Sequence, residues 1–138
     1  SVAAATVRLE TTVLASRADR SRGILAFGVD PAQVLTEIDM KATLTAKLGQ
    51  DAGDELGDYL ILGACNPPLA RRAVGIDRQI GLLLPCNVVV RGNPAEDGTV
   101  LVEAMNPQLL VQVTDQPELQ PVADEVTAKL QAAIDSLA

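Results

Sequence analysis

Histidine and tryptophan are absent from the 138 residues, and the aromatic side chains are reduced to one tyrosine and one phenylalanine. The lack of histidine excludes a cysteine–histidine nucleophile pair, so any catalytic base has to be a carboxylate or a lysine. With so few rings, the core has to be built from Ala, Val, Leu and Ile. The aromatic platforms on which single-stranded bases stack are missing as well.

Positive charge and long apolar runs are also scarce. The net charge is −7, so the long-range field repels nucleic acid and anionic membranes. Arg17, Arg20 and Arg22 cluster, but Asp19 interrupts them, and we interpret them as a solvated helix face. The longest apolar stretches, 80–84 and 88–90, are far shorter than the roughly 20 residues that span a bilayer. We expect neither a nucleic-acid partner nor insertion into a membrane.

Two cysteines are too few for a disulfide framework, which favours a reducing cytoplasm as the location. No cationic region followed by an apolar one opens the sequence as given, so we expect no secretory signal within it. A chain of this length suits a single domain over 1–138 that buries roughly two thirds of its unfolded surface.

The hydrophobic pattern predicts an α+β fold. Alternating or continuous apolar runs predict strands at about 6–14, 34–40, 59–64, 82–91 and 99–105. Helical spacing and end signals predict helices at about 16–27, 41–48, 66–74, 106–113 and 119–137. The acid- and glycine-rich segment 50–58 is typical of a surface loop. This order fits an antiparallel or mixed sheet with helices on one face, and Pro85 is expected at an edge, a bulge or the start of its strand.

Cys65 is the first candidate for chemistry. It directly precedes Asn66, Pro67 and Pro68, which predict a capped helix start. Unpaired amides and the positive end of the helix dipole at such a start would stabilise a thiolate or a bound anion. The alternative is that Cys65 is a small buried hydrophobic residue at a tight strand-to-helix junction.

Cys86 and Asn87 repeat the Cys-Asn pair beside a proline, at the point where the strand is expected to bend. If two strand ends bring Cys65 and Cys86 together, a reversible dithiol or a thiol-lined pocket becomes possible. A zinc site is not favoured, because two cysteines without histidine or C-x-x-C spacing leave too few ligands. We predict no metal site and no cofactor, since the glycines do not follow a nucleotide-binding fingerprint.

Glu37 and Asp39 form the other polar group, on one face of a predicted strand with Lys41 two residues later. Paired carboxylates can divide acid and base roles when their environments differ. The alternative is an exposed face of the sheet.

Three blocks of sequence resemble a known family: V-L-T-E-I-D-M-K-A-T-L-T-A-K-L-G at 34–49, I-L-G-A-C-N-P-P-L-A at 61–70, and I-G-L-L-L-P-C-N-V-V-V at 80–90. From about Val34 to its end, the chain is similar to the bacterial and archaeal domain of unknown function 302. The resemblance implies a curved antiparallel sheet with a long C-terminal helix, in a TATA-binding-protein-like arrangement, and implies no established reaction. It places the family's motif residues on a set that we take as candidate ligand-binding residues: Glu37, Asp39, Lys41, Cys65, Asn66, Cys86 and Asn87.

Three functions remain open at this point. The first is a homodimeric domain that binds a small ligand near Cys65 and Cys86, with dimerisation suggested by the apolar, weakly charged stretch 82–90. The second is a thiol-dependent enzyme or sulfur carrier in which Cys65 reacts. The third is a structural module that binds a partner and does not use the cysteines.

Overall fold

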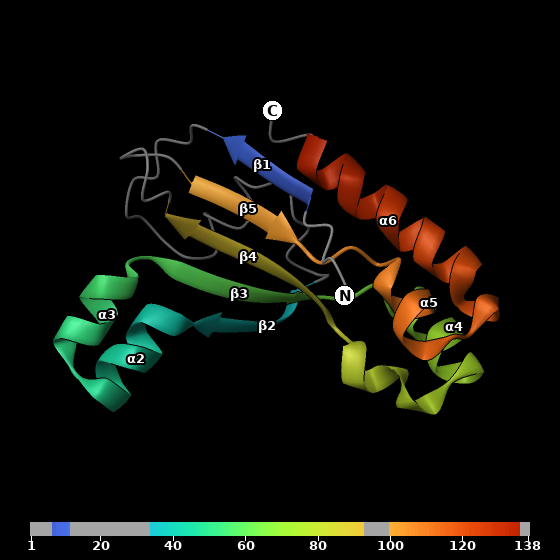
Figure 1. Cartoon of the computed structure of the whole chain (residues 1–138), viewed down its shortest axis with the longest axis horizontal. Helices are drawn as coiled ribbons and strands as arrows, with labels where there is room; N and C mark the ends of the chain where they lie inside the picture. Colours follow the sequence, from blue (N-terminus) through green and yellow to red (C-terminus); the bar gives the residue numbers. More distant parts are fainter. Residues whose placement is uncertain (1–6, 12–33, 93–99, 136–138) are drawn as a thin grey trace.

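The computed structural model describes residues 7–11, 34–92 and 100–135. The helix predicted at 16–27 and the turn residues at 93–98 lie outside these ranges. Within them, a single antiparallel sheet carries helices at both of its ends (Figure 1).

The sheet contains five strands in the order β1-β5-β4-β3-β2. The strands are β1 (Val7–Thr11), β2 (Val34–Asp39), β3 (Tyr59–Ala64), β4 (Cys86–Gly92) and β5 (Val100–Ala104). All neighbours pair antiparallel. The prediction of an antiparallel sheet is confirmed, and β4 lies at its centre, between β5 and β3.

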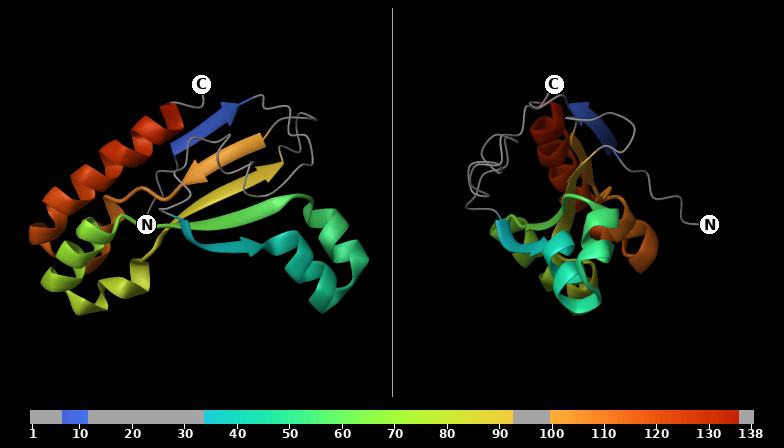
Figure 2. Two further views of the ribbon diagram at one scale, coloured as in Figure 1. Left: turned by 180° about the vertical axis from the view of Figure 1, so that it is seen from behind. Right: turned by 90° about the vertical axis from the view of Figure 1, so that its left-hand side faces the viewer.

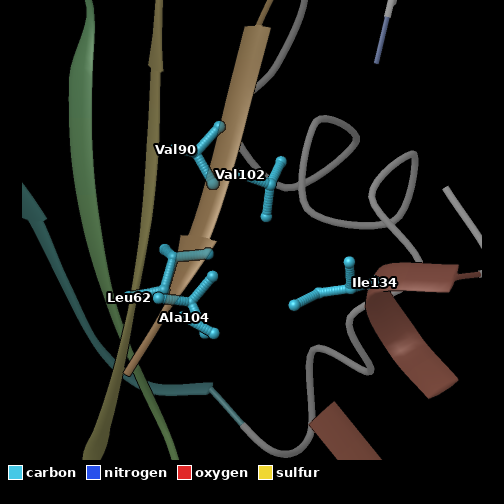
Figure 3. Close-up of a cluster of buried hydrophobic side chains, with 6 residues drawn as sticks. Leu62, Val90, Val102, Ala104 and Ile134 are labelled. Carbon is cyan, nitrogen blue, oxygen red and sulfur yellow. The ribbon is translucent and has the colours of Figure 1, made fainter. Parts of the chain in front are cut away.

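One face of the sheet packs against the C-terminal helix α6 (Gln120–Asp135). The cross-strand pairs Leu62↔Val88, Val88↔Ala104 and Val90↔Val102 place aliphatic side chains on the same face. Ile134 of α6 points toward them (Figure 3). Among the described residues of this core there is no aromatic ring.

The remaining helices form two groups at opposite ends of the sheet (Figures 1 and 2). One group is the pair α2 (Met40–Leu48) and α3 (Gln50–Leu56). The other group consists of four short elements beside α6: α4 (Pro67–Ile76), the 3₁₀ helix η2 (Arg78–Leu83), α5 (Leu109–Thr114) and the 3₁₀ turn η3 (Pro117–Leu119). Their apolar side chains form a second core, which α6 joins to the first.

The prediction of a surface loop at 50–58 is wrong for most of this segment, because Gln50–Leu56 is helical. Gly49, with φ 105°, turns the chain between α2 and α3. Gly53 then lets the two helices meet, since a Cβ there would lie 3.1 Å from the Lys41 carbonyl oxygen and closer still to Thr45 Oγ1. The glycine that suggested a loop is therefore a packing residue.

The strand predicted at 82–91 is also too long at its start. Residues Arg78–Leu83 form η2, whose first turn is capped by Asp77, and Ile80 is fully buried in the second core. The strand begins at Cys86, directly after Pro85. Proline cannot donate a ladder hydrogen bond, so its place before the first strand residue agrees with the prediction.

The other expected elements are confirmed as far as they fall in the described residues, with small shifts of the ends that lie there. The helix predicted to stop at Val74 continues to Ile76 and includes Gly75. Asp39 ends β2 and caps α2, so Met40 belongs to the helix. The described part of the chain contains no helix with the length and apolar character that crossing a membrane requires.

Candidate functional site

A pocket of about 410 Å³ lies between the strand ends that carry the cysteines and the helices α4 and α6. Cys65, Asn66 and Cys86 all line it. Small side chains make much of the wall, namely Ala64, Ala70, Ala73, Ala132 and Ala133. The larger aliphatic residues of the wall are Leu69, Leu84, Leu110, Leu130, Val88, Val122 and Val126. The structure thus brings both thiols to one apolar cavity.

Cys65 is half-buried in the junction between β3 and α4. Asn66 caps the helix, with its Oδ1 accepting a hydrogen bond from the Leu69 amide at 3.3 Å. Pro67 and Pro68 have no N–H to offer, and the Ala70 amide donates to the Asn66 carbonyl at 2.9 Å. The first four helix positions therefore offer no unpaired amide to a thiolate, and stabilisation by the helix dipole stays a prediction.

Cys86 lies deeper than Cys65, opposite Ala64 at the start of β4. Burial raises the pKa of the Cys86 thiol, and the negative charge of a Cys65 thiolate raises it further. The Cys86 thiol is consequently protonated at neutral pH and behaves as part of the apolar wall.

Asn87 does not line the pocket and is exposed. Successive side chains of a strand point to opposite faces, so the pair at 86–87 is divided between the pocket and the other face of the sheet. The Asn87 carbonyl accepts a hydrogen bond from the Met105 amide at 3.2 Å. Of the two Cys-Asn pairs, only the first has both residues at the pocket.

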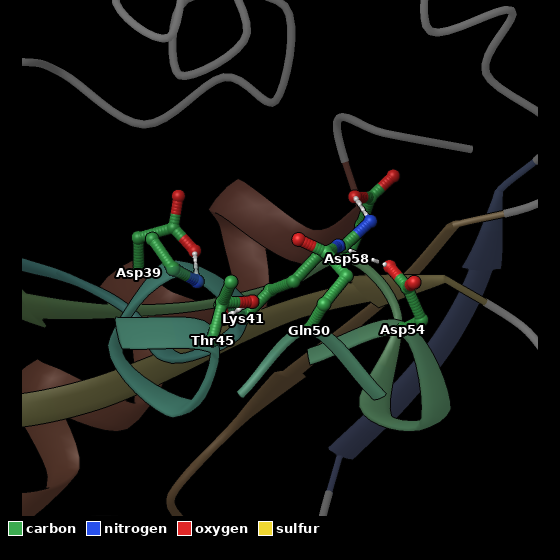
Figure 4. A network of polar contacts seen from close by, with 7 residues as sticks. Asp39, Lys41, Thr45, Gln50, Asp54 and Asp58 are labelled. Atoms are coloured by element: carbon green, nitrogen blue, oxygen red, sulfur yellow. Dashed lines mark hydrogen bonds and ion pairs between the residues drawn. The ribbon is translucent and has the colours of Figure 1, made fainter. Parts of the chain in front are cut away.

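The polar group of Glu37, Asp39 and Lys41 lies away from the cysteines. Asp39 pairs with Leu60 and Cys86 pairs with Ala64, which separates them by roughly 13 Å along β3. Asp39 Oδ1 accepts from the Ala42 amide at 2.9 Å, and Lys41 Nζ lies 3.6 Å from Asp58 Oδ1 (Figure 4). Asp39 thus caps α2, and Lys41 belongs to that helix, as the sequence predicts.

Glu37 is exposed and shares a shallow surface depression with Asp39 and Lys47. The predicted ligand-binding set therefore divides into three residues at the cysteine pocket and three around α2, with Asn87 facing neither group. Across the ranges that the structure covers, no three His, Cys, Asp or Glu side chains gather closely enough to hold a metal ion.

Two features of the pocket are not predicted by the sequence. Lys129, an exposed residue of α6, lines the pocket together with the alanines. Arg72 of α4 donates to Glu125 of α6 at 2.8 Å and links the two helices that form the walls. The apolar stripe of α6 predicts which side of that helix is buried, but it does not predict a cavity.

The comparisons with known proteins agree with this architecture. A crystal structure of an uncharacterised conserved DUF302 protein from Bacillus stearothermophilus superposes with a TM-score of 0.74 at 22% sequence identity, over 96% of this chain and 98% of that one. No curated protein matches the chain. The family model described as domain of unknown function DUF302 matches residues 26–137. The chain therefore belongs to the DUF302 family, with the α+β fold that its sequence predicts.

Proposed function

We propose that this domain binds a small, mainly apolar ligand in the pocket between α4, α6 and the strand ends that carry Cys65 and Cys86. The observation that carries the proposal is the pocket itself, at about 410 Å³. Binding sites for small molecules span about 300–1,000 Å³ and combine apolar walls with a few polar groups. Here those groups are Cys65, Asn66 and Lys129, while the protonated Cys86 belongs to the apolar wall.

The alanines support this reading because they keep the space open. Each one stands where a leucine or a valine would fill part of the cavity. An empty apolar cavity costs a protein the contacts that its lining atoms lose. An occupant of matching shape would restore those contacts.

A filling substitution tests the proposal. N-phenylnaphthylamine is a neutral apolar dye whose fluorescence increases when it is bound, and we expect one saturable site for it. Ala70→Leu should weaken that binding at least about tenfold, because the added methyl groups occupy the pocket. Ala128→Leu is the matched control, since Ala128 lies on α6 but is exposed and does not line the pocket. Unchanged binding by Ala70→Leu would place the dye elsewhere and reject the proposal.

Thiol chemistry at Cys65 is the second candidate function. It is favoured by the difference in burial between the two cysteines. Cys65 is half-buried at the pocket, whereas Cys86 is buried and protonated, so Cys65 is the thiol that a reagent or substrate would meet. Measuring the rate of iodoacetamide alkylation against pH tests this candidate, with Cys86→Ala isolating the reaction of Cys65. The enzyme reading fails if Cys65 reacts only after the protein has been unfolded.

We also propose a cytoplasmic homodimer. The two cysteines are free, which suits a reducing compartment. The apolar stretch 82–90, which suggested a dimer, does not support one, because β4 is a central strand whose Val88 and Val90 are buried in the molecule's own core. Support comes instead from the edge strand β2, where Leu35 and Ile38 are 61% and 46% exposed. Light scattering that shows a monomer at every concentration would reject the dimer.

A further inference from the structure

The pocket has an asymmetric charge. Among the described residues that line it, Lys129 alone carries a charge, and none is acidic. Lys129 is exposed, so its ammonium group reaches water at the rim while its methylene stem can lie along the apolar wall. The rim is therefore cationic in a protein whose net charge is −7.

The carboxylate that is placed to pair with Lys129 already pairs with an arginine. Glu125 lies four residues earlier on α6, where a helix places a carboxylate within reach of a lysine. Arg72 of α4 instead donates to Glu125 Oε1 at 2.8 Å. Over the residues that the structure covers, no carboxylate lies within ion-pair distance of Lys129. The ammonium group remains available to a ligand.

We propose that the occupant of this pocket is a free amphiphile with one anionic head group, of the fatty-carboxylate type. Its carboxylate pairs with Lys129 at the rim, and its hydrocarbon chain lies between the alanines of α4 and α6, toward Cys65 and Cys86. This inference rests on the proposed function and adds the class of ligand. The apolar wall favours a hydrocarbon tail, since each buried CH₂ adds to the free energy of binding. The ammonium group of Lys129 favours a head group with a negative charge.

Three probes with the same ten-carbon chain test the head group: decanoate, decanol and decyltrimethylammonium. Each is titrated against the full chain loaded with N-phenylnaphthylamine, decanoate and decyltrimethylammonium below their micelle concentrations and decanol below its solubility limit. We expect decanoate to displace the dye at a concentration up to about fivefold lower than decanol, which is the upper end of the range of an exposed ion pair. Decyltrimethylammonium should be the weakest of the three.

Two substitutions test whether Lys129 causes the preference for decanoate. Lys129→Gln should make decanoate and decanol equal, and Lys129→Glu should favour decyltrimethylammonium. Lys47→Gln is the control, because it removes the same charge from α2, at the other end of the sheet (Figure 1). It should leave the preference for decanoate intact.

The failures of the two proposals can be separated. Equal displacement by decanoate and decanol in the unmodified protein, or a preference that survives in Lys129→Gln, overturns the anionic head and leaves the apolar pocket in place. Failure of the dye and of all three probes to bind rejects the pocket as a ligand site. Binding to vesicles of phosphatidylglycerol without binding of monomeric decanoate also overturns the inference, since it would indicate a membrane surface rather than a free amphiphile.

Discussion

Arg72 on α4 donates to Glu125 on α6 at 2.8 Å, and this contact withdraws from Lys129 the carboxylate that lies one helical turn before it. The side chains of Arg72 and Glu125 are 47% and 50% exposed, so the pair adds little to stability. Its consequence is electrostatic, because it leaves Lys129, at the rim of the pocket, without a carboxylate partner among the described residues.

Arg72 does not line the pocket. Removing it should nevertheless weaken the binding of an anionic ligand there. In Arg72→Gln, Glu125 is free to pair with Lys129 in the favourable i, i+4 order. We expect the affinity for decanoate to fall about twofold to fivefold and the affinity for decanol to stay unchanged, as measured by dye displacement.

Arg71→Gln is the control for this prediction, because it removes the same charge from the exposed neighbouring position. Adding Glu125→Gln to Arg72→Gln should restore the binding of decanoate. An equal loss for decanoate and decanol would show instead that the ion pair holds the two helices together.

Much of the fold could be predicted from local sequence signals. The continuous apolar run at Tyr59–Ala64 is a strand with those bounds, and the Asn66 cap with its two prolines begins α4. The errors arise where tertiary contacts override composition. Gly53 serves helix packing rather than a loop, and Ile80, Leu83 and Leu84 before Pro85 pack in the helical core rather than in a strand.

The candidate site could be predicted in part, because the signals at Cys65 and Cys86 lie at the ends of neighbouring strands. Antiparallel pairing of Ala64 with Cys86 brings them to one cavity. Lys129 could not be predicted, since its role depends on how α6 crosses α4. Glu37, Asp39 and Lys41 stand close in sequence, but the change from strand to helix at Met40 gives Asp39 and Lys41 local structural partners, while Glu37 is exposed on β2.

Gly53 and Gly75 should respond with opposite signs to the same substitution. Alanine in a helix interior normally stabilises by roughly 0.5–1 kcal/mol relative to glycine. Gly75→Ala should show this gain, because a Cβ there meets nothing within 4 Å. Gly53→Ala should instead lower the free energy of unfolding by roughly 1–3 kcal/mol, because its Cβ would collide with Thr45. Urea denaturation measures both, and a gain of stability in Gly53→Ala would contradict the packing of α2 on α3.

Gly63 should be equally intolerant, with a consequence for the pocket. A Cβ at Gly63 would lie 2.8 Å from Pro85 Cγ and closer still to Thr36 Oγ1. Gly63→Ala should lower the free energy of unfolding by roughly 1–3 kcal/mol and displace the chain beside Cys86. Gly92→Ala is the control in the adjacent strand, because no atom of the described residues lies within 4 Å of a Cβ there. Similar denaturation midpoints for the two variants would show that Pro85 does not press on β3.

The raised pKa of Cys86 predicts a loss of stability at alkaline pH. An unfolded thiol loses its proton near pH 9, whereas burial, with a contribution from Cys65, holds the proton on Cys86 in the folded state. Above that pH the folded state binds more protons than the unfolded state, so the free energy of unfolding falls as pH rises toward the folded pKa. The slope for one such proton is at most about 1.4 kcal/mol per pH unit.

Cys86→Ala should remove this part of the alkaline slope, which urea denaturation between about pH 7 and pH 10 can measure against the unmodified protein. Cys65→Ala should keep most of it, because burial is the larger cause of the shift and remains in that variant. The other titrating groups are common to all three proteins, so the difference between their slopes isolates the buried thiol. If Cys86→Ala and the unmodified protein lose stability in parallel, the Cys86 thiol is in contact with water in the folded state. The proposal that Cys86 forms part of an apolar wall of the pocket is then wrong.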